Sequence, residues 1–206
     1  MAANILVIDS QHPQPHHIGR AVAVLEAEGV IAYPTDSYYG IGCDIFSKKA
    51  IERVYLLKHR DRKKPLSFIC ADLADITQYA KVSNFAYRIL RRLSPGPYTF
   101  VLEATKVVPE IMTTKQKQVA LRVPDSPITA ALVRGLGRPL LSTSASDPED
   151  GEVLIDPADI KERLGHGLDL IVDGGLQLNE PSTVLSLIGD EVEVLREGKG
   201  DPTRAF

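Results

Sequence analysis

Two apolar patterns alternate along this chain, and their order limits the folds that it can adopt. Short runs with β-branched or aromatic residues are typical of buried strands, and stretches with apolar residues three or four positions apart are typical of helices. The two patterns are interleaved, but the last three strand-like runs follow one another with no helix between them. This order favours an α/β or α+β domain with a mixed sheet over a strictly alternating doubly wound fold.

The expected elements follow from these patterns and from the residues that begin or end them. We expect strands at residues 4–8, 30–33, 66–70, 98–103, 119–123, 139–141, 168–172, 183–187 and 192–195. We expect helices at residues 18–25, 51–57, 86–93, 127–134 and 157–164. Ser47, Ser83 and Asp156 are the N-caps of three helices, and Gly29 ends the first helix. Residues 34–42 are predicted to form a turn-rich loop.

Size and composition are those of an ordinary globular protein. The chain has 206 residues, of which 44% are hydrophobic and 25% are charged, and no linker or repeat divides it. We therefore expect one domain over residues 1–206. Two cysteines, no apolar run of about 20 residues and no signal-peptide pattern predict a soluble, cytoplasmic protein with no membrane partner. Because the net charge is −3, any phosphate or nucleic-acid site must be a local basic patch.

Several common catalytic signatures do not occur in the sequence. It has no P-loop, no Rossmann fingerprint, no zinc-protease helix motif and no serine-hydrolase elbow. His12, His16 and His17 lie close together in a proline-rich stretch, which favours a solvated segment over a metal site. We expect no metal site built from the side chains of this chain.

The densest charge lies at residues 58–64, where five permanent cations occur within seven positions. Lys58 and Arg60 follow a predicted helix and are suited to one polyanion, because lysine supplies a point charge and arginine a bidentate fork. Pro65 and a buried-type strand follow at once, so this segment is short. The alternative is a solvated helix end whose cations complement the helix dipole.

Three further groups of residues carry ligand-binding chemistry. Residues 142–146 place four hydroxyls after an apolar strand, although they can also form a turn that satisfies its own backbone. Residues 33–42 combine a threonine, an aspartate and glycines that let a backbone approach a ligand, or else form a hairpin turn. Residues 181–185 and 194–198 are two weaker motifs. No nucleophile has an adjacent base, so the chemistry would depend on positioning and charge stabilisation.

Six motifs, in this order, resemble the YrdC-like family of threonylcarbamoyl-AMP synthases. They are Tyr-Pro-Thr-Asp-Ser with Tyr-Gly-Ile-Gly at 33–42, Lys-x-Arg at 58–60 with Pro-Leu at 65–66, Pro-Gly-Pro-x-Thr at 95–99, Ala-x-Arg-x-Pro at 120–124, Ser-x-Ser-Ala at 142–145, and Pro-Ser-Thr-Val at 181–184 with Arg-x-Gly at 196–198. The resemblance covers residues 18–200. Within the family, residues 141–144 and 196–201 are most similar to the short YciO-type branch.

The resemblance implies a twisted open sheet with flanking helices and a concave basic groove. It implies a nucleotidyltransferase-type enzyme that joins L-threonine, bicarbonate and ATP into threonylcarbamoyl-adenylate and pyrophosphate, for the t6A modification of tRNA. The residues implied to hold threonine are Thr35, Ser142, Ser182 and, on its carboxylate, Arg122. The residues implied to hold ATP are Arg196 and the three catalytic residues Lys58, Arg60 and Ser144. Mg²⁺ would be held mainly by phosphates and water.

One position departs from the family pattern. The motif ends in asparagine where this chain has Ser146, which is shorter and lacks the amide's paired donor and acceptor. One ligand contact is therefore lost or mediated by water, and we expect weaker synthase activity. Two alternatives remain open. One is a non-catalytic module that binds tRNA or double-stranded RNA through the same groove, and the other is a related adenylation of another amino acid.

Overall fold

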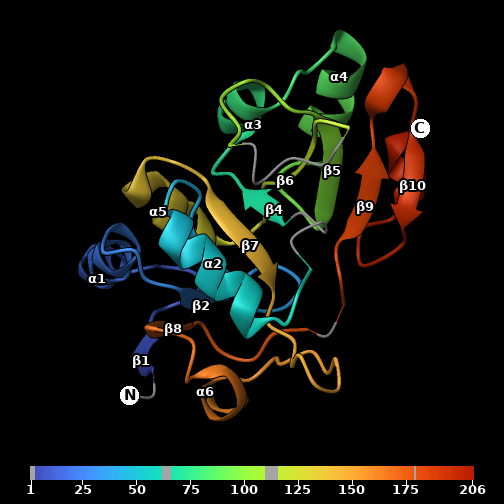
Figure 1. Cartoon of the computed structure of the whole chain (residues 1–206). Helices are drawn as coiled ribbons and strands as arrows, with labels where there is room; N and C mark the ends of the chain where they lie inside the picture. The colour runs from blue at the N-terminus through green and yellow to red at the C-terminus, as the bar shows by residue number, and fades with distance from the viewer. Residues whose placement is uncertain (1–2, 62–65, 110–115, 179) are drawn as a thin grey trace.

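The computed structural model describes residues 3–61, 66–109, 116–178 and 180–206, and Figure 1 shows the path of the chain. Within these residues, ten strands form one sheet in the order β1-β8-β2-β3-β7-β4-β6-β5-β9-β10. The strands are β1 (Asn4–Val7), β2 (Ile31–Tyr33), β3 (Gly40–Asp44), β4 (Ser67–Ile69), β5 (Tyr98–Glu103), β6 (Gln118–Arg122), β7 (Leu140–Ser144), β8 (Leu170–Asp173), β9 (Thr183–Ser186) and β10 (Glu193–Arg196).

Six α-helices occur in the same described ranges, together with two short 3₁₀ helices. They are α1 (Pro15–Glu26), α2 (Lys48–Leu57), α3 (Leu73–Tyr79), α4 (Asn84–Leu93), α5 (Pro127–Leu136), α6 (Pro157–Leu164), η2 (Ile188–Asp190) and η3 (Pro202–Ala205). None of these helices has the length and apolarity needed to cross a bilayer. Residues 62–64 of the expected cation cluster, and Pro65, lie outside the described residues.

Parallel and antiparallel pairs are mixed throughout the sheet. β8 pairs in parallel with both β1 and β2. The pairs β4–β6 and β5–β9 are also parallel. The pairs β2–β3, β3–β7, β7–β4, β6–β5 and β9–β10 are antiparallel. The expected single-domain α/β fold with a mixed open sheet is therefore confirmed, and the first strand lies at one edge of the sheet.

The predicted caps begin the helices for the expected physical reason. Ser47 Oγ accepts the Ala50 N–H at 3.2 Å, and the side chains of Ser83 and Asp156 cap α4 and α6 in the same way. Each side-chain oxygen satisfies a backbone donor that the first turn of a helix leaves unpaired. The end of α1 differs from the prediction, because Glu28 rather than Gly29 takes the left-handed conformation, at φ 62°.

Two elements were not expected from the sequence. β3 occupies part of the predicted loop, and its two glycines weaken the strand signal that the sequence carries. It is held instead by pairing with β2 on one side and with β7 on the other. α3 has only seven residues and begins at Asp72, whose side chain accepts two backbone N–H groups. The strand expected at residues 139–141 also continues to Ser144, so the serine-rich stretch begins inside β7.

The sheet has two faces with separate hydrophobic cores, because successive side chains of a strand point to opposite sides. On the larger core face, strand residues such as Phe68 and Leu121 pack with residues of α2, α3, α4 and α6. On the other face, Ile31 and Leu140 pack with residues of α1 and α5, which also contact each other. In Figure 1, α1 and α5 lie at the left of the view, to the left of β2 and β7.

The smaller core ends part-way across the sheet. In the described part of the chain it contains side chains from β1, β8, β2, β7 and β4 but none from β6, β5, β9 or β10. On this face those four strands carry Ala120, Arg122, Thr99, Val184 and Arg196 instead. Among the described residues, these four strands thus add no side chain to the smaller core, and polar side chains lie on this part of the face instead.

Candidate active site

A cavity of about 200 Å³, called the main cavity below, lies on this face of the sheet and is lined by residues from β3, β7 and β4 as well as from β6, β5, β9 and β10. Side chains at alternate strand positions line it, because only every second residue points to this face. The strand register brings distant residues together here, since Gly40 pairs with Ser144, and Ser67 pairs with both Ser142 and Ala120. A sheet of ten short strands thus gathers residues from both halves of the sequence.

Seven of the eight predicted site residues line the main cavity. They are Thr35, Arg60, Arg122, Ser142, Ser144, Ser182 and Arg196. The eighth, Lys58, lines an adjoining cavity of about 410 Å³, the side cavity, with Arg60, Thr143 and Ser144, which also line the main cavity. The residues predicted to hold threonine therefore share one cavity, and those predicted to be catalytic share the other. Their roles toward a ligand stay predictions.

Arg122 is nearly buried in the floor of the main cavity, with 6% of the residue exposed. Its guanidinium forms an ion pair with Asp36 Oδ1 and donates a hydrogen bond of 3.0 Å to Ser37 Oγ. Two polar atoms of this cluster, Arg122 Nε and Asp36 Oδ2, are buried without a hydrogen-bond partner among the described residues. The cluster is pre-positioned by the protein and still has one donor and one acceptor to satisfy.

Three predicted hydroxyls are held by hydrogen bonds to neighbouring residues. Ser142 Oγ accepts a hydrogen bond of 2.5 Å from the hydroxyl of Tyr33, and Ser182 Oγ lies 2.9 Å from Thr99 Oγ1. Thr35 Oγ1 donates to the Tyr38 carbonyl at 2.7 Å. Each serine and threonine hydroxyl can also accept, so these groups keep hydrogen-bonding capacity for a ligand while their rotamers are fixed.

Arg196 lies at the far side of the main cavity, in the edge strand β10. Its Nη2 donates to the carbonyl oxygen of Ser182 at 2.8 Å and to Ser182 Oγ at 3.2 Å. The same arginine thus orients a hydroxyl predicted to hold threonine. Lys199, which was not predicted, donates from Nζ to the main-chain carbonyl of Asp36 and so joins the C-terminal segment to the loop that follows β2.

Lys58 is the C-cap of α2 and points to the segment that follows β7. Its Nζ lies 2.7 Å from Ser146 Oγ and also contacts the Ser146 carbonyl oxygen. Burial and the nearby charge of Arg60 lower the pKa of Lys58 to about 8, although Asp147 opposes this shift. Arg60 Nη1 lies 3.5 Å from Thr143 Oγ1 at the junction of the two cavities.

The glycines of β3 lie close to the side chain of Tyr33 and to β7. A Cβ at Gly42 would lie 2.8 Å from the Leu141 carbonyl oxygen and 2.8 Å from Tyr33 Cε1. A Cβ at Gly40 would lie 3.0 Å from Ser142 Oγ. The glycines therefore make room for Tyr33 and its hydrogen bond to Ser142, and only Gly40 also lines the main cavity.

Four hydroxyl-bearing residues of the main cavity were not predicted as site residues: Tyr38, Ser67, Thr99 and Thr143. A signal for two of them is present in the sequence. Ser67 and Thr99 are polar residues inside otherwise apolar strands, and such residues point to a polar face of a sheet. Asp36 was noted in its motif, but its pairing with Arg122 could not be found from sequence spacing.

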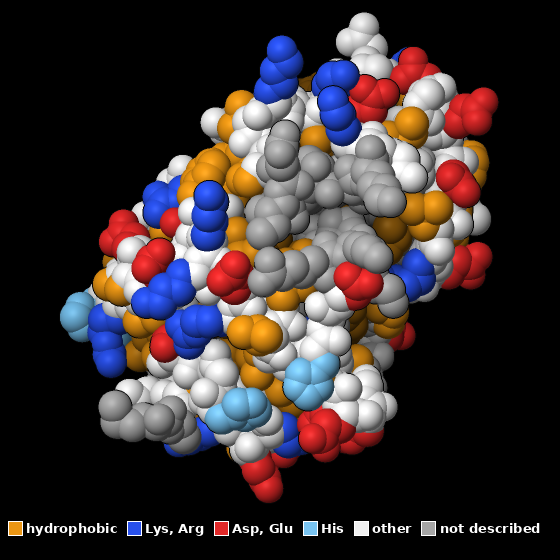
Figure 2. Space-filling view, in the orientation of Figure 1, with side chains coloured by type: hydrophobic (Ala, Val, Ile, Leu, Met, Phe, Trp, Pro, Cys, Tyr) orange, Lys and Arg blue, Asp and Glu red, His pale blue; other side chains and the backbone are white. Residues whose placement is uncertain are grey.

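The concave basic groove implied by the resemblance stays a prediction. Three arginines line the main cavity, but Asp36 neutralises one of them. Figure 2 shows that acidic and basic side chains both occur across the described residues of one face. Among the described residues, no group of three or more His, Cys, Asp or Glu side chains is placed to hold a metal ion.

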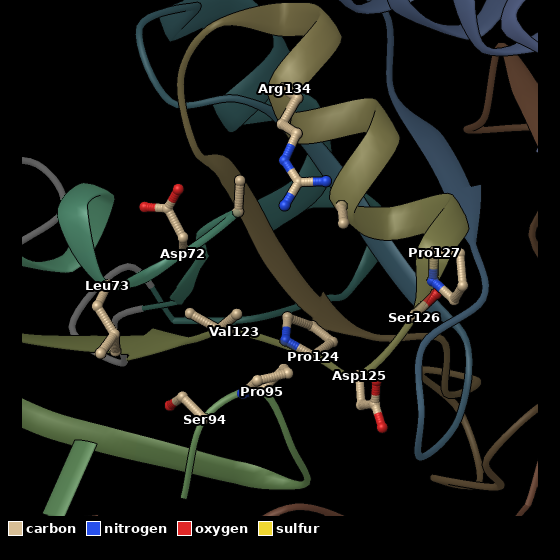
Figure 3. A pocket seen from close by; sticks show the side chains of 12 residues that line it. Asp72, Leu73, Ser94, Pro95, Val123, Pro124, Asp125, Ser126, Pro127 and Arg134 are labelled. Carbon is tan, nitrogen blue, oxygen red and sulfur yellow. The ribbon is translucent and has the colours of Figure 1, made fainter. Parts of the chain in front are cut away.

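A third cavity, of about 320 Å³, lies beyond the ends of β4 and β6. In Figure 3 the guanidinium of Arg134 extends from α5 above Val123 and Pro124, and Asp72 lies across from it. None of the predicted site residues lines this cavity. The main and side cavities, rather than this one, therefore hold the candidate active site.

Comparison with known proteins identifies the family of this chain. A family model described as Telomere recombination, which is named for Sua5, YciO and YrdC, matches residues 23–198. The chain belongs to the Sua5/YciO/YrdC family. The resemblance found from the six sequence motifs is thereby confirmed.

Within this family the chain is similar both to YciO proteins and to synthases. It is 40% identical to the uncharacterized Escherichia coli protein YciO over 94% of this chain and 95% of YciO. The E. coli YciO crystal structure superposes with a TM-score of 0.94 and 38% identity over 99% of this chain and 100% of that one. A Vibrio vulnificus threonylcarbamoyl-AMP synthase is 31% identical over 88% of this chain and 98% of the synthase.

The chain is also similar to a structure of a threonine complex. The crystal structure of P. abyssi Sua5 complexed with L-threonine matches with a TM-score of 0.88 and 26% identity, over 95% of this chain and 58% of that chain. The family relationship supports an enzyme of this family. The E. coli YciO protein, which matches at 40% identity over 94% of this chain, is uncharacterized.

Proposed function

We propose that this protein is a threonylcarbamoyl-adenylate synthase, which joins L-threonine, bicarbonate and ATP and releases pyrophosphate. The observation that carries the proposal is that predicted site residues from six separate segments of the chain meet at the main cavity. They contribute Thr35, Arg60, Arg122, Ser142, Ser182 and Arg196. The Vibrio vulnificus synthase and the threonine complex of P. abyssi Sua5 support the reaction and the amino acid. The product would supply the t6A modification of tRNA.

Threonine would bind in the main cavity at Arg122. A carboxylate oxygen would accept from the buried Nε of Arg122, a donor that otherwise costs free energy because it lacks a partner. The surrounding hydroxyls of Thr35, Ser142 and Ser182 can both donate and accept, so they suit the hydroxyl and the carbamate of the substrate.

The phosphates of ATP would bind where the two cavities meet. Lys58, Arg60 and Ser144 line the side cavity, and two of these residues also line the main cavity. In the reaction a carbamate oxygen forms a bond to the α-phosphorus, and the bond from that phosphorus to pyrophosphate breaks. Both reactants are anions, so the two cations lower their repulsion and stabilise the charge that develops on the phosphates.

The side chains that the structure describes do not form a complete magnesium site. Mg²⁺ prefers oxygen ligands in octahedral geometry, and no group of three or more His, Cys, Asp or Glu side chains among the described residues is placed to hold it. We therefore propose that Mg²⁺ arrives with ATP, bound to phosphate oxygens and water. The residues named above position the nucleotide, and the metal would supply further charge neutralisation.

The test is release of pyrophosphate by the purified full chain with threonine, bicarbonate and Mg-ATP. We expect release that depends on threonine and that falls by about 10²-fold in Lys58→Ala, since a positioned cation is removed. Lys48→Ala is the matched control, because Lys48 lies at the exposed start of the same helix. The same assay with free serine or valine in place of free threonine shows whether the enzyme uses another amino acid, because pyrophosphate release would then be faster with that amino acid than with threonine.

Two results would contradict the proposal. One is wild-type protein that releases no pyrophosphate above a reaction without threonine. The other is a Lys58→Ala protein that is as active as Lys48→Ala. Weak but threonine-dependent release would agree with the expectation from Ser146, at the position where the chain departs from the synthase motif.

A further inference from the structure

A serine and a lysine lie side by side in the side cavity. Lys58 Nζ is 2.7 Å from Ser146 Oγ, and its contact with the Ser146 carbonyl oxygen holds the nitrogen beside this hydroxyl. The two residues are 88 positions apart, one at the end of α2 and the other after β7. The sequence shows no nucleophile beside a base because this pair exists only in the folded chain.

The pair is accessible from the candidate active site. Both residues line the side cavity of about 410 Å³, and Ser146 is partly exposed to it. Ser144 Oγ lies 3.5 Å from Ser146 Oγ, and Ser144 also lines the main cavity. A molecule bound across the junction of the two cavities can therefore present a carbonyl group to Ser146.

The surroundings of Lys58 favour the uncharged form that a base requires. Burial and the charge of Arg60 lower the pKa of Lys58 to about 8, and the carboxylate of Asp147 opposes the shift. His59 and Asp61 are the other ionisable groups that line the side cavity. A serine hydroxyl is a weak nucleophile by itself, and a neighbouring base that takes its proton activates it. The synthase reaction proposed above makes no use of such a nucleophile.

We propose that Ser146 and Lys58 form a serine–lysine nucleophilic pair that hydrolyses acyl- and carbamoyl-adenylates. Threonylcarbamoyl-adenylate is the member of this class that the side cavity would receive, and that identity alone rests on the proposed function. Ser146 stands at the one position where the synthase motif has asparagine, so the hydroxyl replaces an amide that cannot act as a nucleophile. The pair therefore distinguishes this chain chemically from the motif that it otherwise matches.

The hydrolysis has two steps. Ser146 Oγ first attacks the carbonyl carbon of the adenylate, a carbon–oxygen bond to serine forms, the bond from that carbon to the phosphate oxygen breaks, and AMP leaves. Lys58 takes the hydroxyl proton and releases it to solvent. Water then attacks the serine ester, and Lys58 takes a proton from water and returns it to Ser146 Oγ. The products are AMP and an acid, and a carbamic acid loses carbon dioxide to give the free amine.

Arg60 is the group placed to stabilise the negative charge that the attack creates. It lines both cavities and is a permanent cation, so it can face the carbonyl oxygen of an adenylate bound between them. A fixed charge stabilises a developing opposite charge more strongly in a partly enclosed site than in open water, because the site screens the interaction less. Lys58 would act in turn as a charged ligand of phosphate and, after loss of its proton, as the base.

The first test uses a fluorophosphonate probe, which labels activated serines without ATP or threonine. We expect labelling at Ser146, mapped by fragmentation mass spectrometry, at a rate that rises with pH through about 8 as Lys58 loses its proton. Ser146→Ala and Lys58→Arg should each lose about 10²-fold or more, since arginine keeps the charge but cannot accept the proton. Ser10→Ala, an exposed serine away from both cavities, is the matched control.

The second test supplies acetyl-adenylate and measures release of AMP. We expect release above the buffer rate in the wild type and at the buffer rate in Ser146→Ala. Equal labelling of Ser146→Ala and the wild type overturns the pair, whatever the synthase assay gives. Labelling of Ser146 combined with equal AMP release by Ser146→Ala overturns the assigned substrate class. A synthase that makes no pyrophosphate would leave both of these readouts intact, so the two proposals fail separately.

Discussion

Arg122 and Asp36 form an ion pair that is almost entirely removed from water, with 7% and 9% of their side chains exposed. The pair joins β6 to the loop after β2, and both residues lie within the sequence motifs at 33–42 and 120–124. Two charges in such a place stabilise a fold only while both are present, because each alone is a buried, unpaired charge.

Arg122→Ala should therefore destabilise the protein strongly. It leaves the Asp36 carboxylate buried and unpaired, and we expect a loss of about 3–5 kcal/mol in the free energy of unfolding. Urea denaturation measures this loss. Lys81→Ala is the control, because its pair with Glu103 is exposed and should contribute less than about 1 kcal/mol. Equal effects of the two substitutions would contradict the prediction, and Asp36→Asn added to Arg122→Ala should restore part of the lost stability.

ATP binding should weaken as the pH rises. Lys58 attracts phosphate only when charged, and its pKa in the free protein is about 8. Between pH 7 and 9 its charged fraction falls from about 90% to about 10%, so the affinity should fall by up to about tenfold. Calorimetric titration at the two pH values measures the change. The Lys58→Arg variant keeps its charge at both pH values, so its affinity for ATP should differ little between them. If this variant showed the same pH dependence as the wild type, Lys58 would be excluded as the cause.

Removing Ser142 from its hydrogen bond with Tyr33 should reduce the stability of the protein more than removing the hydroxyl of Tyr33. Tyr33→Phe leaves only Ser142 Oγ, which lines the main cavity and can be reached by water, so we expect a cost of about 1 kcal/mol. Ser142→Ala leaves the hydroxyl of the fully buried Tyr33 without its partner, and we expect a cost of about 1–3 kcal/mol. Thermal or urea unfolding ranks the two variants, and the reverse order would contradict this account.

Gly42→Ala should be far more destabilising than Gly19→Ala. The new methyl group at Gly42 would meet the Leu141 carbonyl at 2.8 Å, and a backbone atom inside a sheet cannot move aside. We expect a cost of about 1–3 kcal/mol, typical of overpacking. Gly19 lies on the exposed side of α1 with nothing within 4 Å of a Cβ, so its substitution should stabilise the helix by about 0.5–1 kcal/mol. The unfolding transitions of the two variants give the comparison.

Much of the fold could be predicted because its signals are local. Periodicity predicted nine of the ten strands, all except β3. Hydroxyl or carboxylate caps predicted where α2, α4 and α6 begin. β3 was missed because it depends on its partners, with β2 and β7 supplying the hydrogen bonds and Tyr33 supplying the reason for its glycines. Strand order was also beyond the sequence, since it depends on contacts between distant segments.

The candidate site was predictable in its members but not in its pairings. Residue types in ordered motifs identified the eight side chains that now line two adjoining cavities. The contacts of Arg122 with Asp36 and of Lys58 with Ser146 join residues more than 80 positions apart. No spacing rule gives such contacts, and in both cases the pairing changes what the arginine or lysine can do.

The strands that line the main cavity also carry the larger hydrophobic core on their other side. Along β6, for example, Ala120 and Arg122 face the main cavity, and Leu121 between them is part of that core. Inserting or deleting a single residue in such a strand would exchange the two sides and place an arginine in the protein interior. Substitutions at the strand positions that face the main cavity can therefore change the ligand that the cavity accepts without altering the core. A change in the length of the chain has to be accommodated in the loops.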